Sequence, residues 1–281
     1  MADTQVLGTC VLGRAGSSPA SRTNLNIFKI ILKIFTSIIH LLGFEEGVQL
    51  KNSIPPSSSS SSSPSFPGVP TPPVPPKLRG WSHLIAAPLV FIASLVLFIL
   101  SKESFKFAVA LYALTAVALF SVSAIYHRVP WSPKKKKIWR RLDHANINLI
   151  IAGSYTPFAM TLLTGKDRAV LLWVIWLGAL AGVAIRVFWL SAPRWLYVGI
   201  YLALGWVAII YTPQLYQEGG LKILIPLLLG GLFYSVGALA YAFKFPGKNA
   251  RYFGFHEYFH LFVIAAWVSQ YVAISIAIYT S

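Results

Sequence analysis

The sequence predicts an all-α integral membrane protein, a seven-transmembrane helix bundle, and three observations support this fold class. First, 56% of the 281 residues are hydrophobic and only 11% are charged, whereas soluble domains carry about 25% charged residues. Second, the apolar residues fall in long blocks, and about 20 such residues are enough to span the hydrocarbon core of a bilayer. Third, the basic residues lie mainly between these blocks, where membrane loops are expected.

Seven apolar segments follow one another from residue 77 onward. The pattern predicts transmembrane helices at about 81–100, 105–127, 143–163, 169–188, 195–212, 221–243 and 256–279. If the N-terminus is cytoplasmic, the inside loops hold 14 Lys and Arg residues and the outside loops hold 5. Because basic loops stay in the cytoplasm, we expect the N-terminus inside and the C-terminus outside. The PKKKK run from Pro133 to Lys137 is interpreted as a solvated loop that sets this topology.

Residues 1–76 differ in composition from the membrane domain predicted at 77–281. An unbroken serine run from Ser57 to Ser63 is followed by seven prolines that end at Pro76. Such a segment buries too little apolar surface to become ordered, so it predicts a disordered tail. The apolar stretch at 25–44 carries two lysines in its first third, which favours an amphipathic helix at the interface over a span. The alternative is that this tail has no function.

The net charge of +16 raises the question of a nucleic-acid partner. Nucleic-acid-binding proteins gather their basic residues on one face, whereas here these residues separate the apolar blocks. We therefore expect membrane lipids as partners and no nucleic acid, while the oligomeric state stays open. The single cysteine, Cys10, excludes an intramolecular disulfide and a cysteine-rich metal site. Any bound metal must therefore use nitrogen and oxygen ligands.

Ionisable residues are rare in the predicted spans and gather at one end of them. His127 ends the second span, Asp143 opens the third, and His256 and His260 open the seventh. With the predicted topology, all of them lie at the cytoplasmic end. Ionisable residues inside a membrane are costly and are therefore functional candidates by default.

The histidines have the spacing of a metal site. His256 and His260 are four residues apart, so on a helix they project from one face, one turn apart. His127 can supply a third nitrogen, which leaves the fourth position of a tetrahedral zinc ion open for water, as in catalytic sites. Spacing alone leaves this metal site and simple local hydrogen bonding of the histidines as equal alternatives.

Asp143 and Ser123 are the candidate catalytic residues beside this site. Asp143 can orient or deprotonate the water, and Ser123, one turn before His127, can donate a hydrogen bond to it. The alternative for Asp143 is an acid that stabilises a helix N-terminus or pairs with a neighbouring arginine. His144 should point about 100° away from Asp143, toward the interface. Glu257 should likewise face away from the histidines and meet the basic loops.

The strings SAIYH, LDHANINLIIAGSYTPF and HEYFH resemble three motifs of a known family. It contains the bacterial hemolysin III proteins and the adiponectin and progestin receptors, and is related to alkaline ceramidases. The resemblance covers 77–281 and is strongest to the bacterial hemolysin III branch, which implies the plasma membrane of a bacterium. It implies zinc bound by His127, His256 and His260, with Asp143 and Ser123 at the family's aspartate and serine positions. Asn148 departs from the family, because relatives often carry an apolar or aromatic residue there.

Three functions are compatible with these residues. The first is a zinc-dependent hydrolase of lipid amide or ester bonds. The second is a membrane-permeabilising hemolysin in which zinc only fastens helices together, and the third is a receptor. A pore should carry polar stripes along several spans. Here most spans are apolar all round and the polar residues gather at one end, which favours a buried site.

Overall fold

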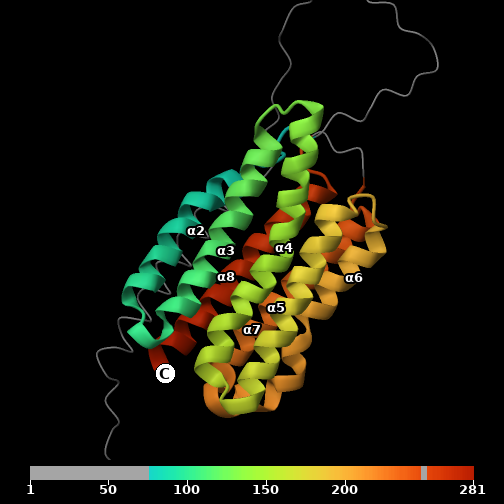
Figure 1. The fold of residues 1–281 in the computed structure, drawn as a ribbon. Helices are drawn as coiled ribbons and strands as arrows, with labels where there is room; N and C mark the ends of the chain where they lie inside the picture. The colour runs from blue at the N-terminus through green and yellow to red at the C-terminus, as the bar shows by residue number, and fades with distance from the viewer. Residues whose placement is uncertain (1–75, 248–251) are drawn as a thin grey trace, which may run out of the picture. The chain divides into compact units, whose positions relative to one another are not determined.

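The structure, a computed structural model, describes residues 76–247 and 252–281, which form an all-α bundle (Figure 1). Two-residue turns join α2 to α3 and α4 to α5, so the helices of each pair run antiparallel. The elements in chain order are α2 (Trp81–Leu100), α3 (Glu103–Arg128), α4 (Pro133–Leu162), α5 (Gly165–Phe188), α6 (Arg194–Gly205), the 3₁₀ helix η1 (Val207–Tyr211), α7 (Thr212–Phe243) and α8 (Phe255–Thr280).

Five helical segments of the described chain are long and apolar enough to cross a membrane, which establishes a helical membrane bundle. They are α2, α3, α5, α8 and one continuous stretch, Arg194–Phe243, that combines α6, η1 and α7. The remaining helix, α4, begins with the basic and polar sequence PKKKKIWRRLDHANIN, which lowers its hydropathy. Each predicted span coincides with a helix, but the number of crossings and their direction remain predictions.

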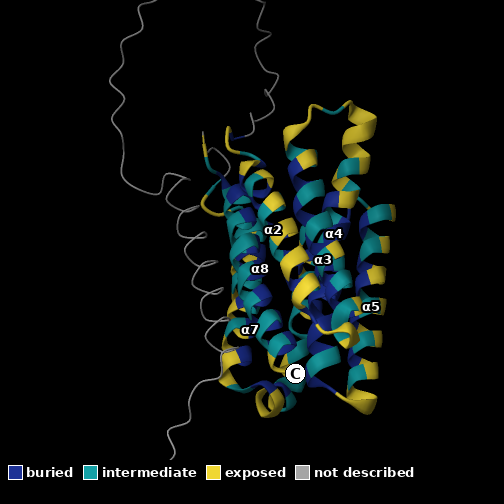
Figure 2. Cartoon of the chain, turned by 90° about the vertical axis from the view of Figure 1, so that its left-hand side faces the viewer, coloured by how far each residue is buried: buried dark blue, intermediate teal, exposed yellow. Residues whose placement is uncertain are grey.

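Helix α8 lies inside the bundle, whereas the outer helices expose large apolar side chains on their outward faces. It packs against α7 and also contacts α2 and α4. In the most apolar 18-residue stretch of α3 and of α8, 50% of the residues are buried, compared with 28% in the corresponding stretches of α2 and α5. Figure 2 shows the distribution of buried residues along the helices. Large side chains such as Phe107 and Trp173 are 75% and 67% exposed. An apolar surface of this kind fits hydrocarbon rather than water.

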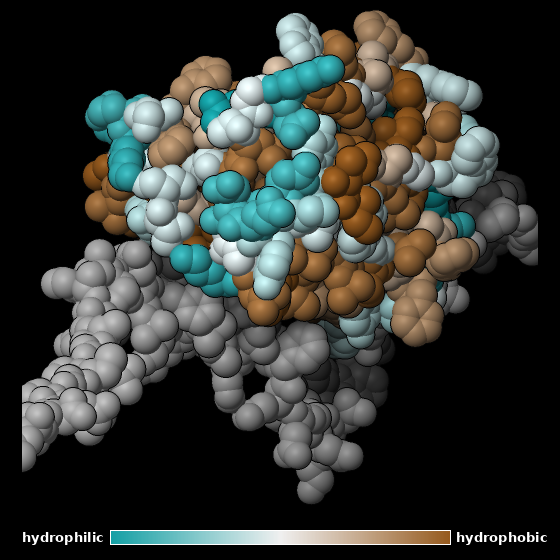
Figure 3. Space-filling model, turned by 90° about the horizontal axis from the view of Figure 1, so that it is seen from below, coloured by the Kyte–Doolittle hydropathy of each residue, from teal (hydrophilic) through white to brown (hydrophobic). Residues whose placement is uncertain are grey.

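One end of the bundle shows where this apolar surface stops. In Figure 3, hydrophilic residues gather in the middle of the end face, and hydrophobic residues cover much of the surface around them. Exposed Lys102 and Lys166 belong to the turn and helix start at this end. A polar end face bordered by apolar sides is the pattern expected at a membrane–water boundary.

Small residues allow the helices around the core to approach closely. A Cβ atom at Gly153 in α4 would collide with Thr115 in α3. One at Gly182 in α5 would collide with the side chain of Asn148 in α4. Asn148 is fully buried, and neither of its amide atoms has a hydrogen-bond partner among the described residues. Close packing of small residues is the usual way in which helices associate in a bilayer.

Helix α7 is interrupted at Gly220, which has φ 62° and ψ −174°. This left-handed φ suits glycine, because a side chain there would clash with the backbone. The helix resumes at once, so the predicted span at 221–243 starts where the second part of α7 starts. The predicted span at 195–212 similarly corresponds to α6 followed by η1.

Two details of the sequence interpretation are wrong. The PKKKK run is not a loop: it forms the start of α4, with Pro133 at the first helical position, where no amide hydrogen is needed. Its lysines are exposed. Arg186 counts among the 14 inside basic residues although it falls within the predicted span at 169–188, and it is in fact buried in the last turn of α5, only 3% exposed. Without Arg186 the predicted charge asymmetry is still 13 to 5.

The predicted low-complexity tail lies outside the described residues, apart from Pro76, and so does the amphipathic helix expected at 25–44. The domain boundary near residue 76 therefore stays a prediction.

The topology can be measured with reporter fusions. Fusions after Gly165 and after Ser281 should report the outside, because the charge asymmetry retains the basic ends of the helices in the cytoplasm. A fusion after Ser132, between α3 and α4, is the matched cytoplasmic control. A cytoplasmic signal after Ser281 would contradict seven spans with the N-terminus inside.

Candidate metal centre

Three histidines from two distant helices meet at one end of the bundle. His127 is the penultimate residue of α3, while His256 and His260 lie in the first two turns of α8. The Nε2 atoms of His127 and His256 are 3.0 Å apart. One ring nitrogen from each of the three histidines lies within 4.8 Å of the other two. The structure thus brings together the three residues that the sequence analysis selected as ligands.

These nitrogens fit a metal ion. Two nitrogens about 2.0–2.1 Å from one tetrahedral zinc ion lie roughly 3.3 Å apart, close to the observed separation. The donor set consists of imidazoles, which suit zinc, copper, iron or nickel. His260 is 2% exposed and its Nδ1 has no hydrogen-bond partner among the described residues. Local hydrogen bonding therefore does not account for all of the polar atoms in this group.

The first turn of α8 is held in place by Glu257. This side chain is 1% exposed, and its Oε2 accepts a hydrogen bond of 2.8 Å from the backbone N–H of Gly254, the N-cap. Its Oε1 accepts one of 2.9 Å from Nε of Arg79, which precedes α2. The expectation that Glu257 meets a basic residue outside the spans is therefore confirmed. These two hydrogen bonds of Glu257 stabilise the helix turn that carries His256.

The start of α2 packs directly against His127. Gly80 has a left-handed φ of 81°, and a Cβ atom added there would lie 2.6 Å from Cβ of His127. Next to it, the guanidinium of Arg128 lies 4.4 Å from the ring centroid of Trp81. A glycine is therefore required both by the backbone turn and by the space that His127 occupies.

Asp143 and Ser123 lie beside the histidines. Both are buried, and both line the same cavity as His256 and His260. Ser123 lies within hydrogen-bonding reach of the Asp143 carboxyl group. Among the described residues, no arginine forms an ion pair with Asp143, and its one ion-pair contact is His144, at 3.7 Å. Asp143 is therefore not ion-paired with the neighbouring Arg140 or Arg141, although the charge of the more distant Arg186 acts on it.

His144 does not lie where the sequence placed it. It is only partly exposed and lines the same cavity as Asp143. Its Nδ1 is 2.6 Å from the backbone oxygen of Arg140. The reason is that α6 covers this side of α4: the Tyr201 hydroxyl donates to the backbone oxygen of His144 (3.3 Å), and Tyr197 packs edge-on against its ring. His144 is not one of the three convergent ligands.

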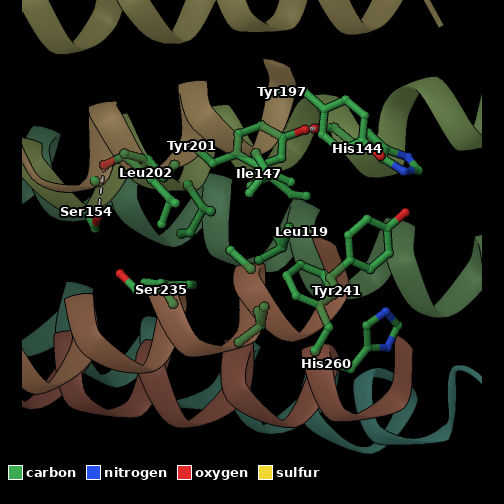
Figure 4. A pocket seen from close by; sticks show the side chains of 18 of the residues that line it. Leu119, His144, Ile147, Ser154, Tyr197, Tyr201, Leu202, Ser235, Tyr241 and His260 are labelled. Carbon is green, nitrogen blue, oxygen red and sulfur yellow. Dashed lines mark hydrogen bonds between the residues drawn. The ribbon is translucent and has the colours of Figure 1, made fainter. Parts of the chain in front are cut away.

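The cavity extends from the histidines into the apolar core. Its volume is about 90 Å³. His144, Tyr241 and His260 lie toward one end of it, whereas Ser154 and Ser235 lie toward the other (Figure 4). A second cavity shares six lining residues with it and extends the space further along the bundle; the shared residues are Ser154, Tyr155, Gly205, Trp206, Gly231 and Gln270.

Sequence analysis missed two buried ionisable residues near this site. His83 in α2 is 2% exposed and stacks on His260, with ring centroids 3.9 Å apart and an interplanar angle of 8°. Arg186 in α5 places its guanidinium 4.2 Å from the ring centroid of Tyr197. Both stand within apolar blocks, as in GWSHLIAAPL and VAIRVF. The rule that an ionisable residue in a span is a functional candidate would have identified them.

Comparison with known proteins supports a family for this chain. It is 32% identical to "Hemolysin-3" of Bacillus cereus over 187 residues, which are 65% of this chain and 82% of that protein. It is 33% identical to "Hemolysin-3 homolog" of Bacillus subtilis (strain 168) over 134 residues, 48% of this chain and 62% of that protein.

A human protein is similar as well. "Monocyte to macrophage differentiation factor" of Homo sapiens is 28% identical over 184 residues, 63% of this chain and 72% of that protein. The sequence profile described as "Haemolysin-III related" matches residues 74–271, which include all three convergent histidines. Since this match covers more than half of the sequence, the chain belongs to the haemolysin III-related family of multi-pass integral membrane proteins.

Proposed function

We propose that this protein is a zinc-dependent hydrolase that cleaves an amide or ester bond of a membrane lipid. The observation that carries the proposal is the position of Asp143. It lies with Ser123 on the wall of a largely apolar cavity that also reaches His256 and His260. A carboxylate, a hydroxyl group and three convergent nitrogens beside an apolar space are the components of metal-assisted hydrolysis of a lipid.

Each residue has a distinct task in this reaction. His127, His256 and His260 would hold zinc, which as a Lewis acid polarises a carbonyl group and lowers the pKa of bound water to about 7. The Asp143 carboxylate accepts a proton from the attacking water and passes it to the leaving group. The Ser123 hydroxyl donates a hydrogen bond to Asp143, which orients the carboxylate.

The cavity wall sets the orientation of the substrate. Leu119 and Ile147 line it between the two ends, and Leu202 lines it near Ser154 (Figure 4). A lipid acyl chain gains little free energy by moving from hydrocarbon into an apolar cavity, because both surroundings are equally apolar. The wall therefore contributes position rather than affinity, and holds the scissile bond near the polar end.

A membrane-permeabilising function with a structural metal is the second candidate. The histidine cluster joins α3 to α8, so a metal there would fasten these two helices, while His83 of α2 packs against one of the three histidines. The names of the Bacillus relatives also refer to hemolysis. The concentration of the ionisable residues Asp143, His144, His256 and His260 at one end of the cavity favours the hydrolase, since a conducting path needs polar groups all along its length.

The three histidines should bind about one zinc ion per chain. Replacing His127, His256 or His260 with Ala should weaken binding by more than about 100-fold, because removal of a ligand costs more than removal of an orienting neighbour. Metal analysis of the detergent-purified full chain, with a competing chelator, measures this. His144→Ala is the matched control and should retain the metal, and equal loss in this control would contradict the assigned ligand set.

The hydrolase and the membrane-permeabilising protein with a structural metal predict different effects of Asp143→Asn on lipid hydrolysis. This variant keeps the shape of the side chain but removes its basicity, so it should retain zinc and lose lipid hydrolysis by roughly 10²–10⁴-fold. Release of fatty acid from a lipid extract measures the reaction, and dye leakage from liposomes is followed on the same preparation. If Asp143→Asn leaves dye leakage unchanged and no zinc-dependent product is released, the hydrolase is ruled out. The membrane-permeabilising function with a structural metal would then remain.

A further inference from the structure

His83 is buried where a polar side chain needs an explanation. It is the third residue of α2, and one face of its ring lies against His260 at a centroid distance of 3.9 Å. Phe120 of α3 meets the ring edge-on at 4.9 Å. Neither ring nitrogen of His83 forms a hydrogen bond of ordinary length among the described residues, although the backbone of His260 lies close to the ring. Burying a polar group without a partner is unfavourable, so an apolar residue would be the better choice for packing alone.

His83 is not a fourth ligand in this geometry. The group of ring nitrogens that lie within 4.8 Å of one another contains His127, His256 and His260, and does not include His83. Its ring is instead nearly parallel to that of His260, with an interplanar angle of 8°. In such a stack the two rings meet face to face, and His83 contacts the ring of the ligand rather than the position of the metal.

Among the described residues, no hydrogen-bond partner of Nδ1 fixes the orientation of the His260 ring. A metal-binding histidine ordinarily donates its second N–H to a carboxylate, a carbonyl oxygen or water, and this bond sets the orientation of the ring. The described part of the chain thus supplies no hydrogen bond to fix the plane of the His260 ring, while His83 packs against one face of that ring.

We propose that His83 is a positioning residue of the metal centre, which holds the ring of His260 in the ligating orientation by face-to-face stacking. A bound metal would draw electron density from the His260 ring. The face of a neutral, electron-rich ring such as that of His83 would then stack more favourably on it. Phe120 and the backbone of α2 hold His83 in turn, so that this contact links the first helix of the bundle to the centre. The inference rests on the proposed metal site, but not on any hydrolytic activity.

Three substitutions separate the possible roles of His83. His83→Phe keeps a flat ring and removes both nitrogens, His83→Gln keeps polar atoms and removes the ring, and His83→Leu fills the space with neither. Ser94→Ala is the matched control: Ser94 also lies in α2, is 2% exposed and has an unpartnered hydroxyl, but it does not line the cavity. Thermal unfolding of each purified full-length variant verifies that it is folded.

The readouts are zinc affinity, by chelator competition, and the visible absorption spectrum of the Co²⁺-substituted protein, which reports the ligand geometry. His83→Phe and Ser94→Ala should retain the wild-type affinity within a few fold and the wild-type Co²⁺ spectrum. His83→Gln and His83→Leu should bind zinc about 10–100-fold more weakly, the loss typical of a residue that orients a ligand. Their Co²⁺ spectra should change.

The other outcomes overturn the proposal in distinguishable ways. If His83→Phe loses as much affinity as His83→Leu, a ring nitrogen acts directly and stacking is not the cause. If all three variants of His83 bind as the wild type does, His83 is an ordinary core residue and only this inference fails. A wild-type protein that binds neither zinc nor Co²⁺ would remove the metal centre itself, and with it both the inference and the proposed hydrolase.

Discussion

The contact between the first turns of α8 and the end of α3 is the constraint on which the candidate site depends. Glu257 caps α8 through Gly254 and receives a hydrogen bond from Arg79, so the helix start cannot shift without leaving a buried carboxylate unpaired. Buried charges are tolerated only when they are paired in this way. At the end of α3, Gly80 packs closely against His127. The convergence of the histidines is therefore a result of how these helix ends are joined.

The polar end and the apolar cavity have complementary roles. Polar groups are expensive in hydrocarbon, so they lie at one end of the bundle, where Asp143 and Ser123 can satisfy each other. Away from that end, the core is made of close helix contacts at Gly153 and Gly182, which leave little free space. The cavity is the exception, and it reaches from His260 past the junction of α6 and η1, where the Tyr155 hydroxyl donates to the backbone oxygen of Gly205.

Aromatic packing connects the outer helices to this centre. His83 stacks on His260, and Tyr241 of α7 approaches His256 at a ring distance of 5.7 Å. On the far side of the cavity, Tyr197 and Tyr201 of α6 cover His144. Rings pack densely without requiring many hydrogen bonds, which suits a region where water is scarce. Helices far apart in the sequence thus meet around a single cavity.

Sequence alone predicted the membrane class, the approximate positions of the helices and the three histidines that converge. Hydrophobic length and the i, i+4 spacing of His256 and His260 are local properties, and they survive folding unchanged. Tertiary structure alone decided that His144 shares the cavity with Asp143 and that His83 stacks on His260. It also buried Arg186 and extended α4 through the lysine run. These outcomes depend on which helix covers which face, and periodicity within one helix carries no information about its neighbours.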